Sequence, residues 1–239
     1  MRAVLLAAVL VGCASATPHT RIAFGSCAFQ WKEQPIWDAV IATKPDLYLS
    51  LGDAIYGDFD GTRVVPVTKE SLKAEWDELA ARPKFQRLRK SIPIMAVWDN
   101  HDYGTHDGGA EFALKETSKQ IFLDFFGEPA GSPRRKRAGI YDAKIFGRVQ
   151  VILLDTRSFK GPYVLKERSG RTGSMGKYAP NPDPSVTLLG AEQWRWLEAR
   201  LRAGRGPPRR LQHAGHSRPD REWTSGATIR TSGEDSSTS

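Results

Sequence analysis

Two short polar clusters follow apolar runs in this sequence and contain the residue types that bind metal ions and phosphate. The first is Leu51–Tyr56 (LGDAIY) and the second is Trp98–Asp102 (WDNHD). Together they offer carboxylates, a phenol, an amide and an imidazole, a mixture that suits hard cations and a phosphate group better than it suits packing. We therefore expect the two clusters to contribute to one site.

The first cluster joins a flexible residue to a ligand. Gly52 lets the backbone turn tightly, and the carboxylate of Asp53 has two oxygens with which it can bridge two cations. Taken alone, a Gly-Asp pair more often caps the segment that follows, and Tyr56 alone would more often be a core or rim aromatic. The residues of this cluster leave both interpretations open.

The second cluster is more informative. Asn100 can offer a neutral carbonyl oxygen to a metal, and His101 beside it can donate a proton or stabilise charge on a phosphoryl group. Asp99 and Asp102 add negative charge that would be repulsive without a cation nearby. The alternative is a structural turn that uses Asp and Asn as caps.

The apolar periodicity predicts an α/β fold that would bring these clusters together. Expected strands cover residues 21–26, 46–51, 92–98, 139–146 and 148–154, and expected helices cover 35–43, 68–83, 112–126 and 190–201. Ligands of such sheets collect at the carboxyl ends of the strands. Polar residues follow the expected strands at Cys27, Asp53, Asn100 and Asp155.

Four segments in order resemble motifs of the PhoD-like (alkaline phosphatase D) family of calcineurin-like metallophosphoesterases. They are Phe24–Cys27 (FGSC), Leu51–Tyr56, Val97–Gly104 (VWDNHDYG) and Leu154–Arg157 (LDTR). Residues 119–129 and 139–141 are similar to the same family, and the resemblance covers residues 20–203. It implies a metallo-dependent phosphatase fold, a β-sandwich flanked by helices in four α/β/β/α layers, here lacking its C-terminal strands.

The resemblance also implies a site and a reaction. Cys27 and Tyr56 would ligate Fe³⁺, Asp53 would bridge to a second site that holds Ca²⁺, and Asn100 would be a ligand of that second site. His101 would contact the phosphate or the leaving group, and Arg157 would face the phosphate. The activity implied is hydrolysis of phosphate mono- or diesters by metal-activated hydroxide.

The N-terminal residues have the features of an export leader. In residues 1–16, Arg2 supplies a positive charge and is followed by the apolar run Ala3–Val11. The run leads to a lipobox-like Leu-Val-Gly-Cys that ends at Cys13, and Ala14–Ala16 is an alternative cleavage site. We expect a protein exported to the bacterial periplasm or cell surface, with a lipid anchor at Cys13 as its one membrane contact. Cys27 then has no disulfide partner, so it is either a structural thiol or a metal ligand.

The chain has 239 residues and a net charge of +8, which favours anionic partners in general. Much of the excess lies in runs such as Arg134–Arg137, which are typical of solvated loops, so we expect a phosphate-ester substrate and no specific nucleic-acid binding. A basic lipoprotein that binds anionic polymers through Arg134–Arg137 is an alternative. The oligomeric state is left open.

The chain changes character after residue 203. Residues 204–239 contain few large apolar side chains and no helix or strand periodicity, which predicts a disordered tail or a shifted reading frame. The closing Gly-Asp-x-His-type motif of the family is not found there. His213 and His216 have a spacing that resembles a metal pair, but we do not expect them to be ligands. A catalytically inactive, truncated fragment of the family is therefore a second alternative.

Overall fold

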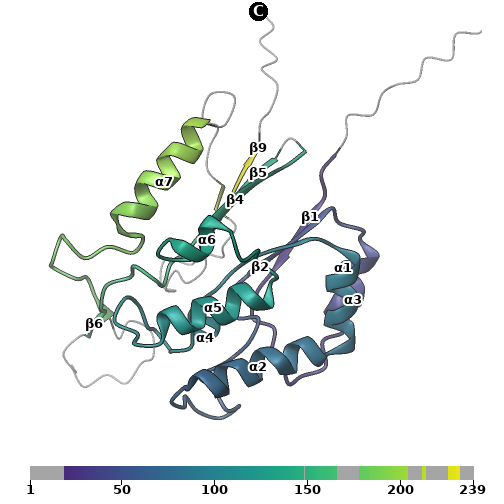
Figure 1. The fold of residues 1–239 in the computed structure, drawn as a ribbon, viewed down its shortest axis with the longest axis horizontal. Coiled ribbons are helices and arrows are strands. Elements are labelled where there is room, and N and C mark those ends of the chain that lie inside the picture. Colours follow the sequence, from purple (N-terminus) through teal and green to yellow (C-terminus); the bar gives the residue numbers. More distant parts are fainter. Residues whose placement is uncertain (1–18, 148, 166–177, 204–211, 214–225, 232–239) are drawn as a thin grey trace, which may run out of the picture.

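The protein has a mixed α/β structure with two main sheets (Figure 1). The computed structural model describes residues 19–147, 149–165, 178–203, 212–213 and 226–231. The first sheet is parallel and has the order β1 (Ile22–Gly25), β2 (Leu47–Leu51), β3 (Ile94–Val97). The central strand β2 is buried at every position, as expected for a strand between two parallel neighbours with both faces covered.

The second sheet is antiparallel. It has the order β4 (Asp142–Phe146), β5 (Val149–Leu154), β9 (Gly226–Thr231), β8 (Gln212–His213). The strands expected at 139–146 and 148–154 are present as β4 and β5, which pair with each other on either side of Gly147. A separate two-stranded ribbon joins β6 (Val164–Leu165) to β7 (Tyr178–Ala179).

The region after residue 203 differs from its prediction at two places. Regular structure was not expected there, yet β9 pairs with β5 along its length and β8 pairs with β9. Three of the six residues of β9 (GATIRT) are β-branched, and the strand supplies a partner for an edge of β5 that would otherwise be open. The other residues of 204–239, His216 among them, and the whole leader 1–16 with Cys13 lie outside the described residues.

Helices connect the strands. They are α1 (Ile36–Ala42), α2 (Lys69–Ala81), α3 (Pro83–Ser91), α4 (Asn100–Tyr103), α5 (Lys115–Phe125), α6 (Pro133–Lys136) and α7 (Gly190–Ala203). The predictions of α1, α2, α5 and α7 are confirmed, and Thr68 caps α2 in a capping box with Ser71. α3 was not predicted because Pro83 was interpreted as the end of α2, whereas Pro at the first turn of a helix is favourable.

One core extends through both sheets. Val151 and Leu153 of β5 belong to the same buried cluster as Leu49 of β2 and Met95 of β3. Trp76 of α2 lies edge-on to Phe122 of α5 in this cluster. α7 lies beside the second sheet, far from α1, α2 and α3 (Figure 1). Within the described part of the chain, no helix combines the length and the apolar character needed to cross a membrane.

The sequence predicts Trp194, Leu197 and Leu201 as the apolar face of α7, and this prediction is wrong for Trp194. Leu197 is buried, but Trp194 is 49% exposed and Gln193 is buried instead. Gln193 Oε1 accepts a hydrogen bond of 2.7 Å from the backbone N–H of Asp155, and its Nε2 donates one of 2.8 Å to the carbonyl of Asp155. The side chain of Gln193 thus pairs with both backbone polar groups of Asp155 just after β5. For this reason the buried face of the helix contains Gln193 and not Trp194.

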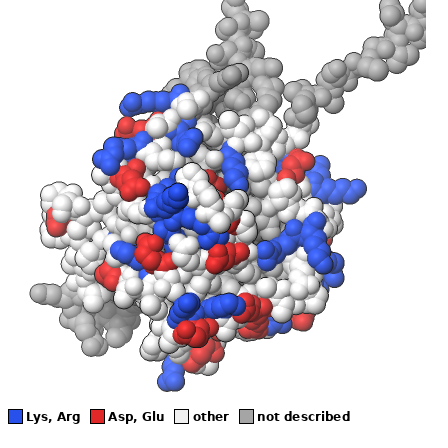
Figure 2. Space-filling view, viewed as in Figure 1, with Lys and Arg blue, Asp and Glu red and all other residues white. Residues whose placement is uncertain are grey.

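The basic run Arg134–Arg137 is not a solvated loop. Arg134 is buried in α6 and donates to the carbonyls of Ala96 (2.8 Å) and Ile140 (2.6 Å). Arg135 pairs with Asp124 at 2.8 Å, and the guanidinium of Arg137 lies 4.0 Å from the centre of the Tyr141 ring. On the face shown in Figure 2, Lys and Arg are interspersed with Asp and Glu. The run therefore serves the fold rather than forming a basic surface.

Candidate metal centre

Asp53 lies between the two polar clusters at the carboxyl end of the parallel sheet. β2 ends at Leu51, and Gly52 follows with φ +103°, where a Cβ atom would lie 2.6 Å from the backbone nitrogen of Asp99. Only glycine permits both that conformation and that approach. Asp53 itself has φ +51°, a conformation uncommon outside glycine, and its buried carboxylate meets groups from both clusters.

Cys27 and Tyr56 lie on one side of this carboxylate. The thiol of Cys27, which is exposed, donates to Oδ2 of Asp53 at 3.6 Å, and Cys27 also has a positive φ of 62°. The backbone N–H of Cys27 donates to the carbonyl of Gly52 at 3.2 Å, which fixes the two loops together. Tyr56 is buried and stacked on Phe29 with ring centroids 4.2 Å apart.

Asn100 and His101 lie on the other side, in the first turn of α4. The backbone N–H of His101 donates to Oδ1 of Asp53 at 3.3 Å. Nδ1 of His101 lies 2.5 Å from Oδ1 of Asp58, and Nδ2 of Asn100 lies 3.2 Å from Nδ1 of His106. The structure thus brings together four of the predicted residues, Cys27, Asp53, Tyr56 and His101. Asn100 precedes His101 in α4, and its side chain contacts His106.

Asp102 holds the two clusters in place. It is fully buried, and its carboxylate accepts hydrogen bonds from the backbone N–H groups of Asp53, Ile55 (3.0 Å) and Asp99 (3.0 Å). Asp99 and Asp102 also form the capping box of α4. Asp99 and Asp102 are therefore structural caps, as the alternative interpretation expected, while His101 between them contacts Asp53 and Tyr56.

Arg157 and Asp155 support the same edge from β5. The guanidinium of Arg157 is buried and pairs with Asp99, with Nε 2.8 Å from Oδ1. Asp155 accepts from the indole of Trp98 at 2.9 Å and from the backbone of Ile140 at 2.8 Å, which is a framework role. Arg157 meets the site through Asp99, and its contact with a phosphate stays a prediction.

Burial shapes the proton affinity of the site. Burial, with the charge of Asp99 as a second cause, raises the pKa of Asp53 to about 6. Cys27 is exposed as a residue, but partial burial of its thiol raises the pKa of that group. Burial together with the charge of Asp53 raises the pKa of the Tyr56 phenol. A bound cation replaces the protons on groups like these, so the site is suited to bind metal.

The donor set fits two different cations. A thiol, a phenol and a carboxylate oxygen on one side are typical ligands of a transition metal, and the amide and carboxylate oxygens on the other suit a harder cation. Asp53 belongs to both sets because its two oxygens face different groups. This is the arrangement in which one carboxylate can bridge two ions.

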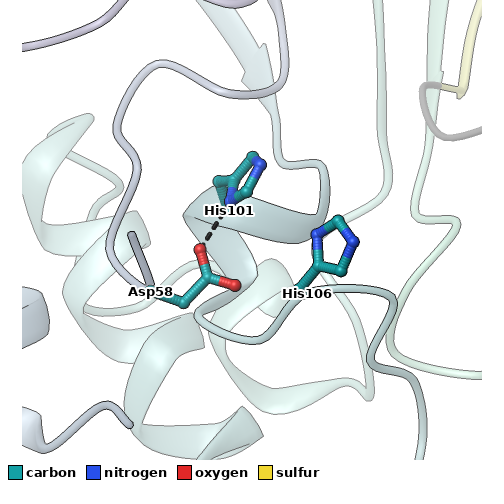
Figure 3. Close-up of side chains that lie close together, drawn as sticks. All are labelled: Asp58, His101 and His106. Atoms are coloured by element: carbon teal, nitrogen blue, oxygen red, sulfur yellow. Dashed lines mark hydrogen bonds and ion pairs between the residues drawn. The ribbon is translucent and has the colours of Figure 1, made fainter. Parts of the chain in front are cut away.

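Two residues near the site were not predicted. Asp58, His101 and His106 form a group in which one potential ligand atom from each lies within 4.8 Å of the others (Figure 3). Asp58 follows the first cluster and His106 follows the second. Their proximity to the clusters in sequence was the only available signal, since neither residue directly follows an expected strand.

The fold and the site define a mixed α/β domain with a candidate metal centre at the carboxyl ends of parallel strands. The family model described as PhoD-like phosphatase matches residues 22–207, and the chain belongs to this family. The solved structure titled "Structure of PhoD" is similar to this chain, with a TM-score of 0.62 and 19% sequence identity over 79% of this chain and 40% of that one. The chain thus spans less than half the length of that structure. The search of curated proteins found no match.

Proposed function

We propose that this chain is a metal-dependent phosphoesterase that hydrolyses phosphate mono- or diesters. The observation that carries the proposal is the position of Asp53, with Cys27 on one oxygen and the backbone of His101 on the other. Membership of the PhoD-like phosphatase family supports the reaction class. The four-layer α/β/β/α arrangement is part of the proposal, and it is supported by the core that the two sheets share.

The ions we propose are Fe³⁺ and Ca²⁺. Cys27, Tyr56 and one oxygen of Asp53 would hold the iron, and the other oxygen of Asp53 with Asn100 would hold the calcium. Ions bound there would lower the pKa of water to give a nucleophile near neutral pH and would stabilise the charge of the phosphoryl group.

The chain's own residues would orient the ester and move protons. Burial lowers the pKa of His101, but the hydrogen bond to Asp58 and the charge of Asp53 raise it more, so the net shift is upward. A protonated imidazole at this position can donate to the leaving oxygen. Arg157 neutralises Asp99, and this pairing limits the negative charge that surrounds Asp53.

We also propose that the protein is exported. Residues 1–16 would be the leader, and Cys13 would be the point of lipid attachment. The alternative of a basic polymer-binding protein is weakened by the inward contacts of Arg134 and Arg135.

The test is hydrolysis of an aryl phosphate monoester and an aryl phosphate diester by the full chain, purified with iron and calcium. We expect hydrolysis of at least one ester, with a loss of 100-fold or more in Cys27→Ser and His101→Gln, within the range of metal-site and acid–base effects. His19→Gln, at an exposed histidine that is not among the proposed site residues, is the control. A folded, metal-loaded chain with no hydrolysis would contradict the proposal and favour the inactive-fragment alternative.

A further inference from the structure

Asp58, His101 and His106 come from three parts of the chain and converge beside the proposed centre (Figure 3). Asp58 lies in the loop after β2, His101 in α4, and His106 in the loop that follows α4. In Figure 3 the His101 ring lies above the Asp58 carboxylate and the His106 ring lies to its right. The group includes none of the four proposed ligands of iron and calcium: Cys27, Asp53, Tyr56 and Asn100.

Only one of the two carboxylate oxygens of Asp58 has a hydrogen-bond partner among the described residues. Its Oδ1 lies 2.5 Å from Nδ1 of His101, whereas Oδ2 is buried and has no hydrogen-bond partner among the described residues. Asp58 is 1% exposed, so water does not compensate that oxygen over an open surface. A buried carboxylate oxygen beside two imidazoles is an arrangement that a cation would complete.

The donor types indicate which cation. Imidazole nitrogen and carboxylate oxygen are the ligands of Zn²⁺ and similar divalent transition metals, and two histidines with one carboxylate are a common set for a site that keeps an open position. Ca²⁺ and Mg²⁺ prefer oxygen ligands alone. The group therefore differs in chemistry from the neighbouring pair of ions as well as in its residues.

The geometry is within reach of such a site. Ligand atoms around a tetrahedral Zn²⁺ lie about 3.3 Å apart, given bonds of about 2.0 Å, so atoms that now lie within 4.8 Å must move closer by small side-chain rotations. The side chain of His106 is 44% exposed, so it can rotate by exchanging its contacts with Asn100 and Asp107 for the ion. The side chain of His101 is 15% exposed and is held by Asp58. A cavity of about 410 Å³ that is lined in part by Asp58 and Thr105 adjoins the group.

We propose that Asp58, His101 and His106 bind a divalent transition-metal ion of the Zn²⁺ type at a site that adjoins the centre around Asp53 and uses none of its proposed metal ligands. The ion binds through one carboxylate oxygen and two imidazole nitrogens and keeps an open position for water. It reaches the site from the side of His106, the most exposed of the three. Because a histidine that binds a metal is neutral, an ion bound here takes the place of the proton that the proposed function assigns to His101, so occupancy of this site and acid catalysis by His101 exclude each other.

The test is Zn²⁺ binding to the metal-free full chain, measured by calorimetry, with Co²⁺ absorption as a spectroscopic probe of coordination by nitrogen and oxygen. We expect His106→Gln and Asp58→Asn each to weaken binding at this site 10-fold or more and to remove its Co²⁺ spectrum. Cys27→Ser should leave both unchanged. Circular dichroism checks the fold, and if Asp58→Asn does not fold, the half-exposed His106→Gln alone decides.

Two controls exclude other histidines. His19→Gln and the double variant His213→Gln/His216→Gln should bind Zn²⁺ at this site as the unmodified chain does. Equal stoichiometry and affinity in His106→Gln and the unmodified chain would overturn the proposal. Loss of the site in the double variant would also overturn it, because the ligands would then lie near the C-terminus.

Discussion

The backbone N–H of His101 donates a hydrogen bond to the carboxylate of Asp53 across a separation of 48 residues in sequence. This bond joins the loop after β2 to the helix after β3, so the two polar clusters form one edge. It also directs Oδ1 of Asp53 toward α4 while Oδ2 faces Cys27. The predictions below test the groups that maintain this relationship and the chemistry it allows.

Asp102→Ala should strongly destabilise the protein. The substitution leaves the buried N–H groups of Asp53, Ile55 and Asp99 without their acceptor. Since each unsatisfied buried donor costs about 1–3 kcal/mol, the free energy of unfolding should fall by about 3 kcal/mol or more. Urea denaturation measures the change, with the exposed Asp77→Ala as control. Similar losses for the two variants would contradict the role given to Asp102.

Gly52→Ala should destabilise the protein more than Gly61→Ala. Both glycines have a positive φ, so both variants carry the conformational cost of about 1 kcal/mol. Only at Gly52 does the new Cβ meet backbone, 2.6 Å from the nitrogen of Asp99, while Gly61 has nothing within 4 Å. We expect an excess of about 2 kcal/mol at Gly52, in the range of overpacking effects, from parallel urea titrations. Equal costs would show that the close approach is unimportant.

Arg157→Met should remove about 3–5 kcal/mol from the free energy of unfolding. The substitution leaves the charge of the buried Asp99 carboxylate uncompensated, and an uncompensated buried charge strongly destabilises the folded state. Arg202→Met provides the comparison, because the pair between Arg202 and Glu198 is exposed and should be worth about 0–1 kcal/mol. A small effect at Arg157 would mean that Asp99 is stabilised by other groups.

Glu128 should make the stability depend on pH in the acid range. Burial raises its pKa, but hydrogen bonding to Ser132 and the charge of Arg134 lower it more, so the net shift is below the ordinary value of 4.5. A carboxyl whose pKa is lower in the folded state stabilises the fold above its unfolded pKa and loses that contribution as the pH falls. Unfolding of Glu128→Gln at pH 7 and pH 4 should show a stability deficit that shrinks at pH 4. A constant deficit would contradict this.

Sequence reasoning located β1 to β5 and the residues at their ends because each of these apolar runs is short and is followed by polar residues. It did not find β6 to β9. It did not find Asp58 or His106, which lie in loops whose path depends on tertiary contacts. It misplaced the buried face of α7 because Gln193 is polar, although the end of β5 requires its amide. Arg134 was interpreted as a surface charge for the same reason: the carbonyls that it satisfies come from distant segments.

The most direct test of the central claim is the visible absorption of the iron-loaded full chain. If Tyr56 and Asp53 belong to one metal centre, Fe³⁺ should give a tyrosinate-to-iron charge-transfer band that disappears in Tyr56→Phe. The band should remain in the control Tyr163→Phe, because Tyr163 is stacked on Tyr178 and is not among the proposed ligands. Asp53→Asn should weaken the band. An iron-loaded, folded chain with no such band, or one whose band survives Tyr56→Phe, would contradict the metal centre proposed at the edge of this sheet.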